Sequence, residues 1–149
     1  MAVTEPWTPT LEQVADHIPT RTRDSTQPGD ETLLGTFTAE TTPTDEQANR
    51  IIRRAVTEVL SSVGGVVPAS PAYLYEMASA AAALRAAADI ELTYPARQSD
   101  PNLYERLDQR AKDALDALKD AINAPGAGPE ARFPQYSFPT PTWPGDYPV

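Results

Sequence analysis

The sequence predicts a mainly α-helical protein, a small antiparallel bundle of one short and three long helices. Apolar residues recur at the spacing of one helix face from Thr44 to Asn123. The helical stretches open on capping residues and close at glycine or proline. After Asn123 the chain changes to prolines and aromatics, so we expect a bundle domain over residues 1–123 and an extended arm over 124–149.

The first helix is expected to be short. Thr8 or Thr10 can cap it, and Thr10 has Gln13 at the spacing of a capping box. Pro19 is expected to end it. Its apolar face consists of Leu11, Val14, Ala15 and Ile18.

Residues 20–42 show no helical period and predict an irregular loop. A turn is indicated at Gln27–Asp30, and a short strand by the alternation from Leu34 to Ala39. A loop of this length is either functional or disordered, and these features favour neither alternative.

The second helix has the clearest signals. Thr44 and Gln47 form a capping box, and Gly64-Gly65 predicts its end. The charged and polar residues between them fall on the other face. The apolar stripe consists of Ala48, Ile51, Ile52, Ala55, Val56, Val59, Leu60 and Val63.

The third helix is expected between two prolines, from about Pro71 with Ser70 as its cap to about Thr93. Eight of the eleven residues from Ala78 to Ala88 are alanine, and small side chains let neighbouring helices approach closely. We therefore expect this helix at the centre of the bundle. Arg85 and Asp89 lie four apart and are placed to form an ion pair.

The fourth helix is expected to begin at Asp100-Pro101 and to end at Asn123, before Pro125-Gly126. Its apolar stripe consists of Leu103, Leu107, Ala111, Ala114, Leu115, Leu118 and Ile122. The charge run on its other side indicates a solvated face. That run consists of Glu105, Arg106, Asp108, Arg110, Lys112, Asp113, Asp116, Lys119 and Asp120.

Composition narrows the function classes. The net charge is −9 and the sequence pI about 4.5, which argues against a protein that grips nucleic-acid phosphates. The chain has no cysteine, so thiolate catalysis and Cys-ligated zinc are excluded. No secretory signal and no bilayer-spanning run is apparent, and we expect a soluble protein that does not bind membranes.

Chemistry-bearing motifs are not evident, and we expect no enzyme, no cofactor and no metal. The single histidine, His17, has no partner ligands at metal spacing and indicates a helix-end or surface residue. No phosphate-binding glycine loop or nucleophile-elbow motif occurs. A pair of carboxylates brought together by folding stays open as an enzymatic alternative.

The C-terminal arm is the strongest candidate for binding a partner. Five of the chain's eleven aromatics lie in its last nineteen residues, interleaved with five prolines that bar a helix. A disordered tail is the alternative, but disordered segments are poor in aromatics, whereas Trp and Tyr anchor interfaces. The candidate partner-binding residues are Phe133, Tyr136, Phe138, Trp143 and Tyr147 in the arm, together with Trp7 and Phe37. For Trp7 and Phe37, packing on the protein's own bundle is slightly favoured.

The N-terminal part resembles a known family. The residues WTPTLEQVADHIPTRT (Trp7 to Thr22) and LGTFTAETTPTDEQANRIIRRAV (Leu34 to Val56) are similar to the head-to-tail connector adaptors of long-tailed bacteriophages, particularly those that infect actinobacteria. The resemblance covers about the first 60 residues and is moderately specific.

The resemblance implies a helical virion subunit that forms a ring, typically of twelve copies, beneath the portal of the capsid. Such a ring extends the DNA channel, lets double-stranded DNA pass without specific binding, and presents a surface to the tail-side neck proteins. It implies assembly in the host cytoplasm, a loop at Thr20–Thr42 that reaches a neighbouring subunit, and an arm at Ala124–Val149 that docks on the portal. The alternative function is a monomeric helical module whose proline-aromatic tail is a ligand for a partner's groove.

Overall fold

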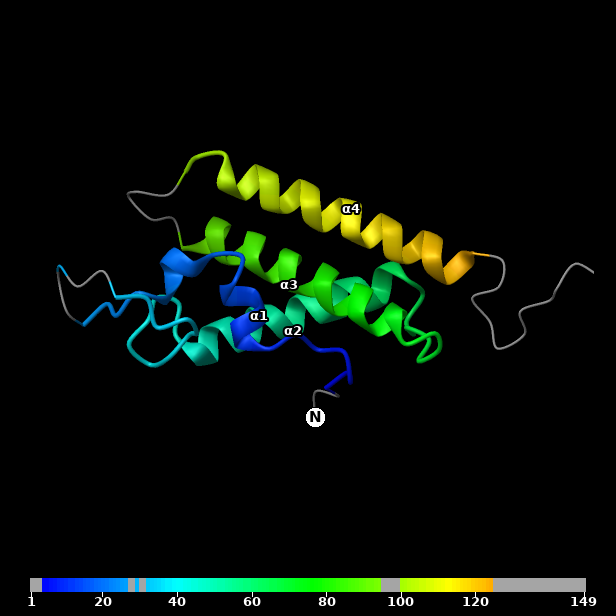
Figure 1. Ribbon diagram of the computed structural model, residues 1–149, viewed down its shortest axis with the longest axis horizontal. Coiled ribbons are helices and arrows are strands. Elements are labelled where there is room, and N and C mark those ends of the chain that lie inside the picture. The colour runs from blue at the N-terminus through cyan, green and yellow to red at the C-terminus, as the bar shows by residue number, and fades with distance from the viewer. Residues whose placement is uncertain (1–3, 27–28, 30–31, 95–99, 125–149) are drawn as a thin grey trace, which may run out of the picture.

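The computed structural model describes residues 4–26, 29, 32–94 and 100–124. They form α1 (Leu11–Ala15), the 3-10 helix η1 (Pro19–Thr22), α2 (Asp45–Ser62), α3 (Tyr73–Thr93) and α4 (Leu103–Asn123). The central helix, α3, runs antiparallel to α2 and α4, which lie on either side of it, and α1 packs across α2 and α3 (Figure 1). The predicted small helical bundle with one short and three long helices is confirmed.

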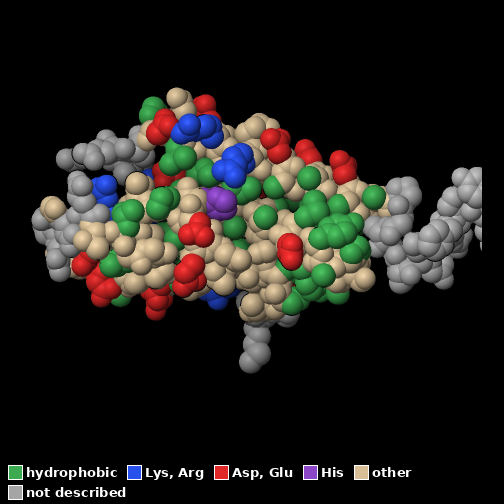
Figure 2. Space-filling view, viewed as in Figure 1, with side chains coloured by type: hydrophobic (Ala, Val, Ile, Leu, Met, Phe, Trp, Pro, Cys, Tyr) green, Lys and Arg blue, Asp and Glu red, His purple; other side chains and the backbone are tan. Residues whose placement is uncertain are grey.

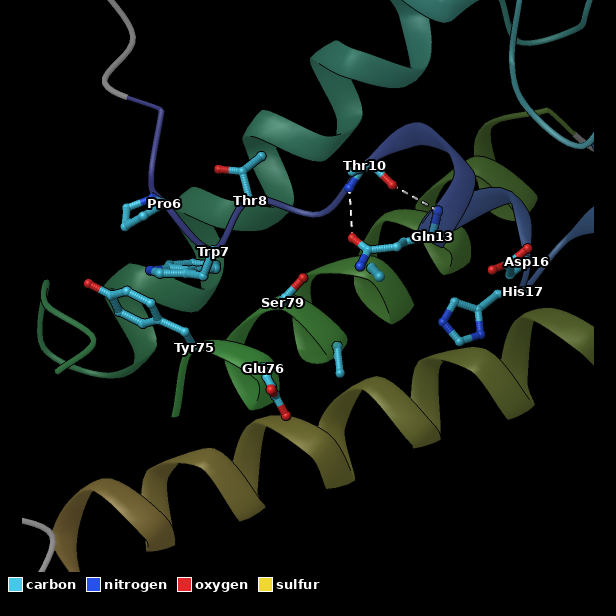
Figure 3. A pocket seen from close by; sticks show the side chains of 12 residues that line it. Pro6, Trp7, Thr8, Thr10, Gln13, Asp16, His17, Tyr75, Glu76 and Ser79 are labelled. Atoms are coloured by element: carbon cyan, nitrogen blue, oxygen red, sulfur yellow. Dashed lines mark hydrogen bonds between the residues drawn. The ribbon is translucent and has the colours of Figure 1, made fainter. Parts of the chain in front are cut away.

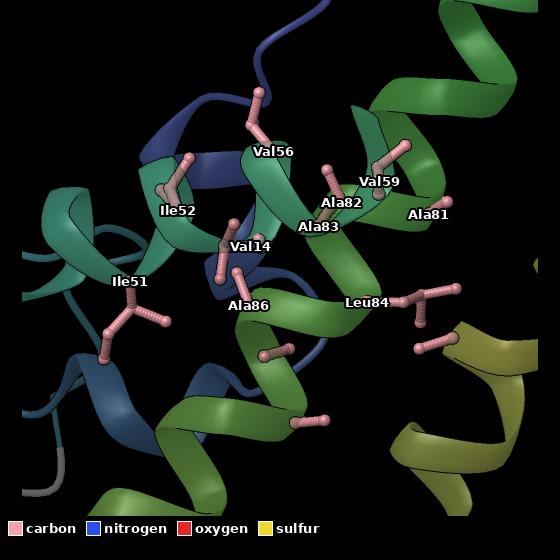
Figure 4. Close-up of a cluster of buried hydrophobic side chains, with 14 of the residues drawn as sticks. Val14, Ile51, Ile52, Val56, Val59, Ala81, Ala82, Ala83, Leu84 and Ala86 are labelled. Carbon is pink, nitrogen blue, oxygen red and sulfur yellow. The ribbon is translucent and has the colours of Figure 1, made fainter. Parts of the chain in front are cut away.

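The alanines of α3 put this helix at the centre of the core, as expected. Its buried residues lie on all sides of the helix, from Leu74 to Glu91. Figure 4 shows Val56 and Val59 of α2 close to Ala82 and Ala83, while Leu84 points toward α4. Small side chains on α3 let the flanking helices approach closely, and larger side chains on those helices fill the space between them.

The helix boundaries of α1 and α2 follow their capping residues. Both Thr10 with Gln13 and Thr44 with Gln47 form complete capping boxes. At the end of α2, Gly64 has φ +88°, and the Gly65 N–H donates to the Leu60 carbonyl at 2.7 Å. This is the bond pattern of a left-handed glycine cap, which only glycine adopts without backbone strain.

The starts of α3 and α4 differ from the prediction. The α3 helix begins at Tyr73 rather than at Pro71, and no side chain caps it. The Leu74 and Tyr75 N–H groups bond to the carbonyls three residues back, so Pro71 and Ala72 form a turn before the helix. Similarly, α4 begins at Leu103, because Asp100 folds a turn in which its carboxylate accepts from the Asn102 N–H at 2.9 Å.

The strand expected from Leu34 to Ala39 is wrong. In the described part of the loop, the only strand-like pairing is an isolated bridge between Arg23 and Leu33. Threonine side chains hold the loop instead: Thr22 Oγ1 accepts from the Gly35 N–H at 3.2 Å, and Thr41 Oγ1 accepts from the Thr38 N–H at 3.0 Å. Threonine hydroxyls that bond to nearby backbone N–H groups compete with the hydrogen bonds between paired strands. In this loop the hydroxyls take the place of those strand hydrogen bonds.

Most of the described loop lies against the body. Thr22 and Thr41 are fully buried, and Phe37 joins the core. Leu33 and Leu34 remain exposed near the loop tip. Across the ranges that the structure describes, no helix combines the length and apolar character needed to cross a bilayer.

Candidate functional site

The predicted partner-binding residues divide into two groups. Phe133, Tyr136, Phe138, Trp143 and Tyr147 lie outside the described residues. Trp7 and Phe37 are 3 % and 2 % exposed and belong to the core. The expected packing of these two on their own bundle is confirmed, and a contact of either one with a partner would require its side chain to leave the core.

A groove runs along α3 beside the N-terminal segment and α1 (Figure 3). It is open, with a volume of about 580 Å³. Its floor consists of the small residues Ser79, Ala80 and Ala83, because the alanine-rich face of α3 does not fill the space beside α1. Trp7 and Tyr75 lie at one end, and His17 lies at the other.

The polar groups of the groove include a histidine with a perturbed pKa and two buried donor groups. Burial is the main cause that lowers the pKa of His17, the Arg110 charge lowers it further, and Asp16 opposes both. The neutral ring is therefore favoured. Within the described chain, His17 makes no side-chain hydrogen bond or ion pair. Two buried atoms of lining residues, Trp7 Nε1 and Thr8 Oγ1, have no hydrogen-bond partner among the residues that the structure describes.

A charged cluster around Arg85 joins the three long helices. Arg85 Nη1 donates to Asp108 Oδ1 of α4 at 2.6 Å, and Nη2 donates to Asp89 Oδ1 at 2.5 Å. Glu58 of α2 lies 3.8 Å from Arg85 Nε. Burial lowers the pKa of Arg85, but the hydrogen bonds to Asp89 and Asp108 outweigh it, and the pKa is raised overall.

This cluster corrects one expectation and confirms another. The pair of Arg85 and Asp89 is present as predicted. Asp108 was expected on a solvated face of α4, but its side chain is only 18 % exposed, whereas most of that charge run is exposed. Hydrogen bonds from Lys112 and then Arg85 hold the pKa of Asp108 below its ordinary value. The charges of this cluster are paired with one another, so we assign it a role in holding the three long helices together rather than in binding a ligand.

A buried ion pair between Arg21 and Glu91 was not apparent from the sequence. Arg21 Nε and Nη2 donate to the two carboxylate oxygens of Glu91 at 2.7 and 2.8 Å. The side chains are 7 % and 3 % exposed. The pair joins η1 to the last turn of α3 across 70 residues of sequence, a separation at which neither residue carries a local signal.

A metal site is not formed by the described residues, which contain no group of three or more potential His, Cys, Asp or Glu ligands. No protein-family model matches the chain, and no curated protein or solved structure matches it either.

Proposed function

We propose that this chain is a head-to-tail connector adaptor, a structural virion protein that forms a ring beneath the portal and links the capsid to the tail. The observation that carries the proposal is the sequence resemblance over Trp7–Thr22 and Leu34–Val56. The ring would extend the DNA channel and would assemble in the host cytoplasm before joining the capsid-tail neck.

The resembling residues have defined positions in the fold. Trp7 and Phe37 are core residues, and Thr10 and Thr44 are the caps of α1 and α2. The resemblance therefore involves residues that determine how the N-terminal segment, the loop and α2 pack. These roles show what the resembling residues do in the fold, and the function is proposed from the family that the sequence resembles.

Two further properties are consistent with a channel subunit. The net charge of −9 would repel DNA phosphates, which favours sliding rather than binding. The helices bury one another's large side chains, among them Ile52, Leu74, Ile90 and Leu118, each under 2 % exposed. The described helices therefore form a core among themselves, and the proposal assigns the aromatics of the C-terminal arm to the portal.

The proposal is tested by mixing the full chain with the portal protein encoded by the same genome. We expect a ring under the portal by negative-stain imaging and a complex mass equal to the portal plus many copies of this chain. A Phe138→Ala/Trp143→Ala variant should keep its helical circular dichroism and lose affinity for the portal. A chain that stays monomeric and shows no affinity for the portal contradicts the proposal.

The alternative function is a monomeric module whose proline-aromatic tail binds the groove of another protein. The sequence PTPTWP, from Pro139 to Pro144, is the observation that favours it, since extended proline-rich segments dock on aromatic-lined grooves. Deleting residues 133–149 separates the two functions. If assembly is unaffected and a single partner is lost, the module is favoured; if attachment to the portal is lost, the adaptor is favoured.

A further inference from the structure

The outer face of α2 carries three cations in a strongly acidic protein. Arg50, Arg53 and Arg54 are exposed, and their spacing places them on one side of the helix. None of them makes an ion pair or a side-chain hydrogen bond with another described residue. By contrast, Arg21, Arg85, Arg106, Lys112 and Lys119 all pair with carboxylates. We call Arg50, Arg53 and Arg54 the arginine stripe.

The outer face of α4 carries a complementary set of anions. Asp113, Asp116 and Asp120 are exposed at helical spacing, and the exposed Ala117 lies between them. We call the three aspartates the aspartate stripe. Within the described chain, Gln109 Nε2 donates a hydrogen bond to Asp113 at 2.8 Å, Lys119 Nζ lies 4.0 Å from Asp116, and Asp120 makes no ion pair or side-chain hydrogen bond. In Figure 2, acidic side chains follow the edge of the molecule formed by the C-terminal half of α4.

The two stripes lie on opposite sides of the bundle. The α2 and α4 helices flank α3 and contact each other only slightly, and each stripe is on the exposed side of its helix, so the two stripes do not meet within one copy (Figure 1). At a rise of about 1.5 Å per residue, the arginine stripe covers roughly 6 Å and the aspartate stripe roughly 10 Å along their helices. The aspartate stripe is therefore long enough to span the whole arginine stripe, and the two are opposite in charge.

We propose that the arginine stripe of one copy of this chain docks on the aspartate stripe of the next copy. Two different patches on opposite sides of a subunit generate a head-to-tail contact, which gives a closed ring when the rotation fits. The small side chain of Ala117 lets the arginines reach the aspartates on both sides of it. The inference deepens the ring assembly proposed above by naming the two faces that meet, and it rests on that function only for ring closure.

A second copy fits the arginine stripe better than nucleic acid does. The chain's net charge of −9 repels a polyanion at long range, and only three arginines are available on this face. A second copy, in contrast, presents an aspartate for each arginine. Charge pairing of this kind fixes register and partner choice, and it weakens as salt rises.

The test uses sedimentation of the full chain at low and high salt with two charge-reversed variants. One variant is Arg50→Glu/Arg53→Glu/Arg54→Glu, and the other is Asp113→Lys/Asp116→Lys/Asp120→Lys. We expect the wild type to self-associate at low salt and each variant alone to associate at least about tenfold more weakly, as three lost pairs imply. Mixing the two variants should restore association, because every contact between unlike copies then joins opposite charges.

Net charge is controlled with a matched pair of variants. Arg53→Glu should weaken association, whereas Arg23→Glu changes the charge equally at an exposed arginine outside both stripes and should not. Circular dichroism must show wild-type helicity for every variant. A wild type that stays monomeric at millimolar concentration, variants that associate like the wild type, or a mixture that does not recover overturns the proposal. The proposal is also overturned if the charge-reversed arginine variant loses binding to duplex DNA but self-associates like the wild type.

The outcome is separable from that of the proposed function. Rings on the portal that form equally well from the charge-reversed variants would contradict the stripe contact and leave the adaptor function standing. Self-association that depends on the stripes, without any affinity for the portal, would support the stripe contact and contradict the adaptor function.

Discussion

The buried pair of Arg21 and Glu91 gives the sharpest prediction about stability. Each side chain is less than 10 % exposed, and the two are joined by two parallel hydrogen bonds. Removing one partner leaves a charge buried without its counterion, which costs about 3–5 kcal/mol. We therefore expect Arg21→Met and Glu91→Leu each to lower the free energy of unfolding by that amount, a large share of a typical domain's stability of about 5–15 kcal/mol.

The pair of substitutions made together should behave differently. With both charges replaced by apolar groups, no buried charge remains, and the double variant should lie within about 1–2 kcal/mol of the wild type. The difference between the double variant and the sum of the single variants is the interaction energy of the pair. It should be several kcal/mol and favourable.

Urea unfolding followed by circular dichroism at 222 nm is the assay. With an m-value of about 2 kcal/mol per molar urea, each single variant should shift the midpoint down by roughly 1.5–2.5 M. Arg106→Met is the matched control, because its pair with Asp100 is exposed and is worth less than about 1 kcal/mol. Single variants that cost no more than Arg106→Met, or a double variant as unstable as the sum, would refute the role given to this pair.

Three further predictions concern the helix cap, the Arg85 cluster and the groove. Gly64→Ala should lower the free energy of unfolding by about 1 kcal/mol, measured by thermal unfolding. The loss comes only from the backbone strain at φ +88°, since a Cβ there meets no atom within 4 Å. An unchanged midpoint would contradict the glycine cap. Arg85→Met should lower the free energy of unfolding in urea by about 2 kcal/mol, because Asp89 and Asp108 lose their shared hydrogen-bond donor. A loss as small as that of Arg106→Met would contradict the role of Arg85 in joining the three helices. Because the folded-state pKa of His17 lies below the ordinary 6.5, its contribution to stability is full above pH 6.5 and is lost as the pH falls through the folded-state pKa. His17→Gln should therefore flatten the fall in stability below pH 6.5, and an identical pH profile would contradict the burial of this ring.

Local signals predicted much of the fold. The capping boxes at Thr10 and Thr44 and the glycine end of α2 are determined by neighbours in sequence, and each is present. The alanines of α3 identified the central helix, because small side chains favour close packing on every side. Composition and spacing carry this information without knowledge of the tertiary structure.

Long-range contacts account for what the sequence did not reveal. The pairing of Arg21 with Glu91 depends on how η1 packs on α3, and Asp108 leaves the solvated face only because α4 brings it to Arg85. The expected strand failed because Thr22 and Thr41 take over backbone bonds that a ladder would use. The groove also escaped prediction, since its floor is made by residues too small to fill the space beside α1.

The central claim, that this chain is a ring-forming adaptor of a phage neck, is tested most directly by cryo-electron microscopy of the neck of the particle that carries it. The account predicts a ring of this helical bundle beneath the portal, with the arginine stripe of each copy against the aspartate stripe of the next and the aromatic arm on the portal. A neck whose density contains no copy of this bundle would contradict the claim.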